Sequence, residues 1–341
     1  MVNTRPPGMN DVAKLAGVSH QTVSRVLNGH PSVRPATRER VLEAITSLGY
    51  RRNSAARALV TAKSGVIGVI TTGSSLFGPQ RALIAIEEAA REAGYFVSMA
   101  TIKRPNARNM SELLGHLVGQ AVEGIVVIAP QAEVLDAVLA FPTTVPVVLY
   151  GGAQSAGRGV QTVSLDQEQA GRMAVAHLAE LGHTRIAHVS GPLDWTDAKE
   201  RLNGWKAECK ARNLQAVPLI QSDWSAERGY EIGIDLVRSG APTAVFAAND
   251  MIALGLIRAF TESGLSVPAD VSVIGVDDVP GASNFLPPLT TIHHHFATLG
   301  KRIIESLLTV LDGGEPTQVV LQPELIVRSS TAPPRQAEVG V

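Results

Sequence analysis

The sequence has little of what secreted and membrane proteins depend on. It has one cysteine in 341 residues, Cys209, which excludes a disulfide within the chain. Its apolar runs, such as 66–70 and 125–129, fall far short of the roughly 18 to 20 residues that span a bilayer. Residues 1–17 contain no apolar stretch of the signal-peptide type. We therefore expect a soluble protein of the reducing cytoplasm, with no membrane association.

Charge is sparse and unevenly distributed. Only 18% of the residues are charged and the formal net charge is −1, while 45% are hydrophobic, a composition that excludes a disordered chain. The length predicts two or three domains. Residues 1–63 carry ten lysines and arginines against three acidic residues, a net of +7, so the rest of the chain carries −8. This asymmetry predicts a module that binds a polyanion, most simply nucleic acid, joined to a body that does not.

The basic segment shows three short helical patterns. Asn10 is placed to cap the first, which Gly17 ends, and Ser19 is placed to cap the second. A third helix is expected over 35–48. The residues expected to face inward are Val12, Leu15, Ala16, Val23, Val26, Leu27, Val41, Ile45 and Leu48. Two short helices joined by a three-residue turn with glycine form a helix-turn-helix unit, whose second helix enters the DNA major groove.

The exposed side chains of the second helix suit base recognition. Gln21 has the two atoms needed to bond adenine, and Arg25 those needed to bond guanine. With His20 they are the candidates for reading bases. A single exposed arginine or glutamine is ordinarily a solvated helix surface, so the prediction of DNA binding depends on their combination with the helix caps, the spacing and the positive charge.

The run DVAKLAGVSHQTVSRVLNG at 11–29 resembles the head of the lac repressor (LacI/GalR) family of transcriptional regulators. The resemblance implies a homodimer that binds a near-palindromic operator in double-stranded DNA. It also implies that 53–60 is the family's hinge helix in the minor groove, with Leu59 as the intercalating leucine; the alternative is that Leu59 is an ordinary core leucine. The implied DNA contacts are Ser19, His20, Gln21, Thr22, Ser24, Arg25, Asn28, Asn53, Ala56 and Leu59.

Two features of the hinge segment bear on how it orders. Its eight or so residues are fewer than the roughly 12 to 15 that make an isolated helix marginally stable, so we expect it to fold only with DNA and a partner helix. The family usually has proline before the hinge asparagine, where this chain has Arg52. We expect hinge ordering to be looser for that reason.

From Val66 onward, short apolar runs alternate with amphipathic helical patterns, which predicts an α/β fold with buried parallel strands. Such sheets bind ligands at the carboxyl ends of their strands. The ends here carry Thr72, Asn249, Asp250, Asp277 and Asp278. The family resemblance extends through this body, notably at 223–226, 248–250 and 287–292. It implies a periplasmic-binding-protein-like (type I) body of two doubly wound subdomains behind the all-α head.

The resemblance further implies domain boundaries. These are a helix-turn-helix domain over 9–52, a hinge helix and linker over 53–63, an effector-binding domain over 64–330 and a flexible tail over 331–341. The N-subdomain would comprise about 64–163 and 293–322, and the C-subdomain about 164–292 and 323–330. The tail is far too short for a coiled coil, and the family's tetramerisation helix has no counterpart, so a dimer is expected.

By matched position, the family's effector contacts fall on Thr72, Leu76, Pro79, Trp195, Asp197, Arg201, Trp224, Asn249, Asp277, His294 and Phe296. Charged and amide groups in this set suit vicinal hydroxyls, and its aromatic faces suit the C–H side of a pyranose, so a sugar or glycoside is the expected effector. Trp195 and Asp197 replace serines of the family pattern, and Ile128 and Gly151 replace polar ligand contacts. The effector is therefore expected to differ from a simple galactoside. Trp224 and Asp277 also have plainer interpretations, as a packing residue and a strand-end cap, and Trp205 is expected in the core.

The sequence shows no sign of catalysis, metal binding or a cofactor. It has no G-x-S-x-G, H-E-x-x-H or C-x-x-C motif. Consecutive residues 293–295 are all histidine, and in no regular element could all three face one metal. Residues 151–159 are glycine-rich but lack a phosphate-loop lysine, which favours a surface crossover.

Two other classes of protein share parts of the pattern. A sugar-binding transport protein would have the same body but a signal peptide and no basic head. An α/β enzyme with an accessory DNA module would turn over glycosides. We favour a DNA-binding repressor under allosteric control, and the sequence leaves open its operator, its effector and whether that effector is an inducer or a corepressor.

Overall fold

The computed structural model describes residues 7–51, 63–102, 106–128, 132–151, 161–215, 217, 219–240 and 242–335. Two compact units emerge, 1–64 and 65–341, and each is described by itself. The expected hinge helix, with Asn53, Ala56 and Leu59, lies outside the described residues, as do most of the glycine-rich run 151–159 and residues 336–341 of the tail.

The first unit has the three expected helices, α1 (Met9–Ala16), α2 (His20–Leu27) and α3 (Pro35–Leu48). Gly17 and Gly49 end α1 and α3 in the left-handed region, at φ 63° and 61°, which glycine adopts without strain. The three helices enclose a small core made of Val12, Ala13, Ala16, Val23, Val26, Val41, Ala44 and Tyr50. The predicted helix-turn-helix is thereby confirmed.

Two details of α1 differ from the sequence prediction. The helix is capped by Gly8 and not by Asn10, because the Asp11 carboxylate accepts the Gly8 backbone N–H at 2.8 Å and fixes the start two residues earlier. Leu15 is 54% exposed, since an eight-residue helix turns Val12, Ala13 and Ala16 toward its neighbours and Leu15 away from them.

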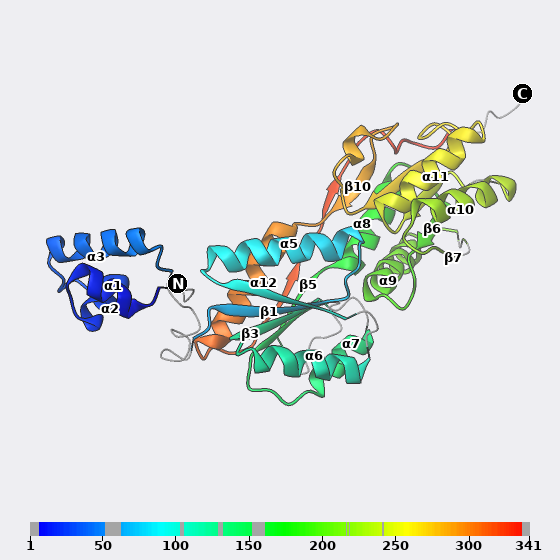
Figure 1. The fold of residues 1–341 in the computed structure, drawn as a ribbon. Helices are drawn as coiled ribbons and strands as arrows, with labels where there is room; N and C mark the ends of the chain where they lie inside the picture. The colour runs from blue at the N-terminus through cyan, green and yellow to red at the C-terminus, as the bar shows by residue number, and fades with distance from the viewer. Residues whose placement is uncertain are drawn as a thin grey trace, which may run out of the picture. The chain divides into compact units, whose positions relative to one another are not determined.

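The second unit contains two six-stranded sheets (Figure 1). The first has the order β11-β5-β4-β3-β1-β2 and the second β12-β10-β9-β8-β6-β7. All pairs are parallel except β10 with β12. The first-sheet strands are β1 (Val66–Thr71), β2 (Phe96–Thr101), β3 (Gly124–Ile128), β4 (Val147–Tyr150), β5 (Gln161–Leu165) and β11 (Gln318–Leu321); those of the second are β6 (Ile186–Ser190), β7 (Ile220–Gln221), β8 (Ala244–Ala247), β9 (Ser272–Val276), β10 (Thr290–His293) and β12 (Glu324–Ile326).

Helices cover both faces of each sheet, as a doubly wound fold requires. On the first sheet, α5 (Phe77–Glu92) and α12 (Phe296–Leu311) cover one face, and α6 (Ala107–Gly119) and α7 (Ala132–Leu139) the other. On the second, α8 (Gln167–Glu180) pairs with α9 (Thr196–Ala211) and α10 (Ala226–Arg238) with α11 (Asp250–Glu262). A short 3₁₀ turn, η2, spans Ala282–Asn284. Helices α10 and α11 approach closely because Gly255 lacks a side chain: a Cβ there would lie 2.0 Å from the Ala226 carbonyl oxygen.

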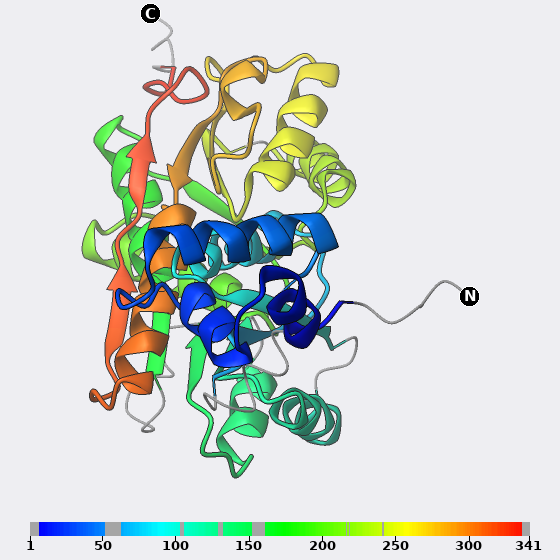
Figure 2. The same cartoon turned by 60° about the vertical axis from the view of Figure 1, so that its left-hand side comes forward.

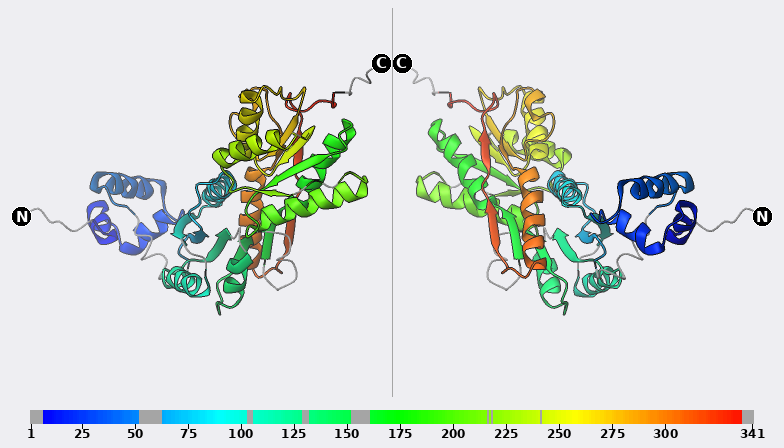
Figure 3. Two further views of the ribbon diagram at one scale, coloured as in Figure 1. Left: turned by 90° about the vertical axis from the view of Figure 1, so that its right-hand side faces the viewer. Right: turned by 90° about the vertical axis from the view of Figure 1, so that its left-hand side faces the viewer.

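The chain crosses between the two sheets three times, from β5 to α8, from β10 to α12 and from β11 to β12. Figures 2 and 3 show the last two crossings in orange and red. Side chains of the three crossings contact one another. Gln322 Nε2, between β11 and β12, donates to Asp166 Oδ2, between β5 and α8, at 3.1 Å. His295 Nε2, between β10 and α12, lies 3.3 Å from Oε2 of Glu324, the first residue of β12. No helix in the described parts of the chain is long and apolar enough to cross a membrane.

A candidate effector cavity and a DNA-contacting helix

The candidate DNA contacts that are described lie on or beside α2. His20, Gln21 and Arg25 are exposed, and none of their three side chains has a hydrogen bond to another described residue. Ser19 is the N-cap: its Oγ accepts the Thr22 backbone N–H at 3.2 Å. The remaining members of the set are Thr22, whose Oγ1 lies 2.9 Å from Ser19 Oγ, and Ser24 and Asn28, which hydrogen-bond each other at 3.5 Å.

In the second unit, a cavity with an empty volume of about 320 Å³ opens at the carboxyl ends of the strands. Its wall consists of Leu76, Phe77, Gly78, Pro79, Trp195, Asp197, Arg201, Trp224, Asn249 and Asp277. The first four follow β1 and begin α5, while the others follow β6, β8 and β9 or lie on and before α9 and α10. Both sheets therefore contribute to one cavity.

Eight of the eleven predicted effector residues lie in this wall. The three that do not are Thr72, His294 and Phe296. Phe296 packs edge-on against Phe77 at 5.9 Å between ring centroids, so it supports the wall from behind. Phe77 and Gly78 belong to the wall and were not predicted; their position between the predicted Leu76 and Pro79 was the available signal.

The central polar group of the cavity is the Arg201 guanidinium, which is only 4% exposed. Its Nε donates to Gln167 Oε1 at 2.8 Å, Nη1 donates to the Ala248 carbonyl, and Nη2 lies 3.9 Å from Asp277 Oδ1. The guanidinium carbon also lies 5.7 Å from the centroid of the Trp224 ring. These contacts hold the guanidinium in one position before any ligand arrives.

Gln167 links this arginine to His294. An arginine can only donate, so the Gln167 oxygen must face it, and the same oxygen lies 3.1 Å from His294 Nε2. His294 must then carry its proton on Nε2. Burial, followed by the charge of Arg201, holds the pKa of His294 well below its usual value, which keeps the ring neutral. Gln167 and His294 stand at two of the three crossings between the sheets.

Two carboxylates face the arginine. Burial raises the pKa of Asp277 to about 7, with the Arg201 charge opposing and Asp197 adding to the increase. Burial likewise raises the pKa of Asp197, which Arg201 partly offsets. The backbone of Asp277 lies at φ 114°, a conformation that costs energy for a residue with a side chain and is concentrated at functional sites.

Trp224 is both a packing residue and a cavity residue. It is buried in the core beside α10 and α11, yet it lines the cavity and meets Trp195 edge-on at 5.9 Å. The indole lies against Gly191, where an added Cβ would come within 2.3 Å of the ring. Asn249 Nδ2 donates to the Trp224 carbonyl at 3.2 Å, and Asn249 Oδ1 caps α11 by accepting the Ile252 N–H. Gly191 was missed by the sequence analysis because its effect depends on the tryptophan that packs over it.

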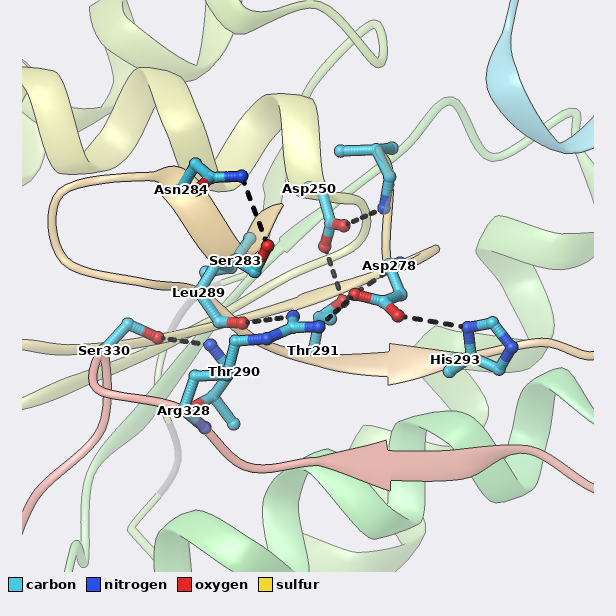
Figure 4. A network of polar contacts seen from close by, with 11 residues as sticks. Asp250, Asp278, Ser283, Asn284, Leu289, Thr290, Thr291, His293, Arg328 and Ser330 are labelled. Carbon is cyan, nitrogen blue, oxygen red and sulfur yellow. Dashed lines mark hydrogen bonds and ion pairs between the residues drawn. The ribbon is translucent and has the colours of Figure 1, made fainter. Parts of the chain in front are cut away.

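The other acidic residues at the strand ends belong to a separate structural network (Figure 4). Asp250 accepts the Thr291 hydroxyl at 2.6 Å and the Val279 N–H at 2.8 Å. Asp278 pairs with Arg328 at 2.7 Å and with His293 at 3.2 Å. The three consecutive histidines consequently face three different partners. Trp205 is in the core, as expected, and its Nε1 donates to the Ile186 carbonyl at 3.1 Å.

Comparison with known proteins agrees with this architecture. The model of bacterial regulatory proteins of the lacI family matches residues 8–53, and that of the periplasmic binding protein-like domain matches 175–331. The lactose operon repressor of Escherichia coli (strain K12) is 35% identical over 329 residues, which cover 96% of this chain and 91% of the relative.

Two solved structures resemble the whole chain. The lac repressor dimer bound to operator and the anti-inducer ONPF matches with a TM-score of 0.89 at 35% identity, covering 96% of this chain and 100% of that one. The complex of the transcriptional regulator CelR with cellobiose matches with a TM-score of 0.70 at 31% identity, covering 95% and 99%. With a helix-turn-helix unit at its start and a binding-protein-like body behind it, the chain belongs to the lacI family of bacterial regulatory proteins and is a DNA-binding transcriptional regulator.

Proposed function

We propose that this regulator is a homodimeric repressor that binds a near-palindromic operator and is controlled by a sugar or glycoside. The observation that carries the proposal is the cavity in which Arg201, Asn249 and Asp277 lie against Trp224. A fixed guanidinium and carboxylate suit vicinal hydroxyls, and a flat indole suits the apolar side of a pyranose.

On the DNA side, His20, Gln21 and Arg25 read base edges in the major groove, and the serines and asparagine around them bind the phosphate backbone or fix the helix. The hinge residues Asn53, Ala56 and Leu59 add contacts in the minor groove, as the resemblance implies. The structure of the related lac repressor dimer on its operator supports this assignment. Such a protein acts on chromosomal DNA in the cytoplasm, without catalytic turnover.

Effector control passes from Arg201 to the crossings between the sheets. Gln167, at the start of α8, accepts hydrogen bonds from Arg201 on α9 and from His294, which directly follows β10. A ligand that re-orients the guanidinium must therefore disturb a hydrogen bond at two crossings. The same crossing segments are also joined by the contacts of His295 with Glu324 and of Gln322 with Asp166. A disturbance at the crossings therefore changes the relative orientation of the two subdomains. In a dimer, that change alters the spacing of the two DNA-binding heads.

A dimer is supported by the edge of the first sheet. Strand β2 is an edge strand on which Phe96 is 78% and Met99 58% exposed. Large apolar side chains on an edge strand favour coverage by another chain. We place the dimer contact of the effector-binding unit there.

The direct test is an operator gel shift with and without candidate sugars, after selection of binding sites from a random duplex library. We expect selected sites to be inverted repeats and a sugar to change their affinity. A transport protein would show no preference among duplexes, and an enzyme would consume glycosides. Either result would replace the proposal.

A further inference from the structure

The cavity contains one carboxylate that the protein leaves without a partner. Asp197 lies in the first turn of α9, one helical turn before Arg201, and forms part of the cavity wall. Its side chain makes no hydrogen bond or ion pair with any residue that the structure describes. Arg201, whose charge acts on Asp197, is hydrogen-bonded to Gln167 and Ala248 and lies within ion-pair distance of Asp277.

The charges in the wall do not balance. Among the described residues that line the cavity, the charged side chains are Asp197, Asp277 and Arg201. Arg201 lies within ion-pair distance of Asp277, so it compensates the charge of Asp197 only in part. Burial raises the pKa of Asp197 despite the nearby guanidinium, which is the behaviour of a carboxylate short of donors.

Another unsatisfied group lies in the same wall. Trp224 Nε1 is buried and has no hydrogen-bond partner in the described structure. It is a donor, whereas Asp197 accepts. The ligand that completes this cavity must offer both a donor and an acceptor, as a hydroxyl group does.

An anion would be a poor occupant. Helix N-termini attract anions, and the first turn of α9 faces this wall, but Asp197 already places a negative charge in that turn. Arg201 is shared between Asp277 and Asp197, so it offers an incoming phosphate less than a free cation would. An anionic ligand would therefore meet a carboxylate that is only partly compensated, in a site lined by buried residues.

We propose that Asp197 determines effector specificity: it accepts a hydrogen bond from a ligand hydroxyl and excludes sugar phosphates and sugar acids, so the effector is an uncharged sugar or glycoside. This inference rests on the proposed sugar-binding function and narrows it.

The test is a binding screen against matched neutral and anionic sugars, such as glucose with glucose 6-phosphate and cellobiose with cellobionate. It uses the full chain, Asp197→Asn and the control Asp194→Asn. Asp194 is an exposed aspartate three residues away that does not line the cavity. Dissociation constants of the ligands that raise the unfolding temperature are then measured by calorimetry.

We expect Asp197→Asn to change the affinities for neutral and for anionic sugars in opposite directions. Neutral sugars bind the unaltered chain and anionic ones do not. Asp197→Asn weakens neutral binding about tenfold or more, since a hydrogen bond to a charged group is lost, and strengthens anionic binding. Asp194→Asn changes neither. Loss of packing would weaken both classes together, so the opposite signs identify a specificity residue.

Several outcomes would overturn the inference. The inference would be refuted if the unaltered chain bound a sugar phosphate or sugar acid more tightly than any neutral sugar. It would also be refuted if Asp197→Asn left the affinity for neutral sugars unchanged. Both results would leave the proposed function standing. Failure of every sugar, neutral or anionic, to bind would refute both. Without ligand, Asp197→Asn should unfold at a higher temperature than the unaltered chain at pH 7, because a charge that the protein compensates only in part is removed; a lower temperature would count against the account.

Discussion

The two binding surfaces of this chain are constructed in opposite ways. His20, Gln21 and Arg25 come from one short helix and are exposed, and their side chains have no hydrogen-bond partner among the described residues. Arg201 and Asp277 come from different elements, are buried, and are held by neighbours. A surface that reads base edges receives its partners from the DNA. A cavity that must detect a small molecule is arranged in advance, because a small ligand offers few contacts with which to arrange it.

The difference has consequences for mutation. Removing an exposed side chain of α2 costs the contact it makes with DNA and little else. Removing a buried side chain of the cavity leaves the groups that were hydrogen-bonded or ion-paired to it unsatisfied. The free energy lost is about 1 to 3 kcal/mol when the group left behind is neutral and about 3 to 5 kcal/mol when it is charged. Changes in the cavity should therefore have larger effects than changes on the helix.

The largest effect is expected for Arg201→Ala. It removes the guanidinium and leaves both Asp277 and Asp197 without a cation, so effector response should be lost, with binding weakened at least about a hundredfold. Operator affinity without effector should remain within a few-fold. Gel shifts on a selected operator, with and without sugar, measure both quantities. Arg201→Lys tests geometry, since it keeps the charge but loses the fork that reaches Gln167 and Ala248; full response in that variant would contradict the prediction.

Arg25→Ala should have the next largest effect, on the other surface. Loss of a bidentate contact with guanine costs about 1 to 3 kcal/mol, so operator affinity should fall roughly 5- to 150-fold while binding to random duplex changes far less. Arg40→Ala removes the same charge from an exposed position on α3. It should weaken binding to the operator and to random duplex by the same factor. Competition assays at fixed salt compare the two; equal loss of specificity in both variants would show that Arg25 acts only through its charge.

Gln167→Ala sharpens the comparison, because it removes the link between Arg201 and His294 without removing a residue of the cavity wall or of α2. It leaves the Arg201 Nε–H and the His294 Nε2–H buried without their acceptor. We expect the effector-induced change in operator affinity to fall about tenfold, which corresponds to roughly 1.4 kcal/mol of coupling. Gln169→Ala, two residues along α8, is the matched control. Nitrogen NMR of His294 provides a second measure: the Nε2-protonated form should lose its dominance in Gln167→Ala and keep it in the control.

The smallest effect concerns pH and should be confined to the body. Burial raises the folded pKa of Asp277 to about 7 and that of Asp250 to about 8, far above their unfolded values near 4. Such carboxyl groups stabilise the fold while protonated, so stability should fall as pH rises from about 6.5 to 8.5, by a few degrees of unfolding temperature. Asp277→Asn should flatten the lower part of this slope. A thermal-unfolding series in pH checks it; a rise over that window would contradict the assignment.

The sequence predicted the head almost completely, because its features are local. Ser19 as a cap and Gly49 as a helix end each depend on neighbours a few residues away. The error at α1 arose from a competition between two local signals, Asn10 as a cap and Asp11 as the partner of Gly8. Both were visible, but only the structure shows which one the backbone adopts.

The cavity was predicted only in part. Its members came from a resemblance, and neither composition nor spacing could show that Trp224 lies against Gly191 or that Gln167 joins Arg201 to His294. Those relations connect segments far apart in the chain. The body's alternating pattern predicted most strands and helices, but it did not identify α12 or the strands β5, β7, β10, β11 and β12. Strands β7, β11 and β12 are short or half-exposed and give little periodic signal.

The most direct measurement of the central claim is the affinity of the full chain for a selected inverted-repeat duplex and for a random duplex of equal length, at physiological salt, titrated with neutral sugars. The account predicts at least about a thousandfold preference for the inverted repeat, two chains per duplex, and a change in that affinity when one of the sugars saturates the cavity. Equal affinity for both duplexes, or an operator affinity that no sugar alters, would contradict it.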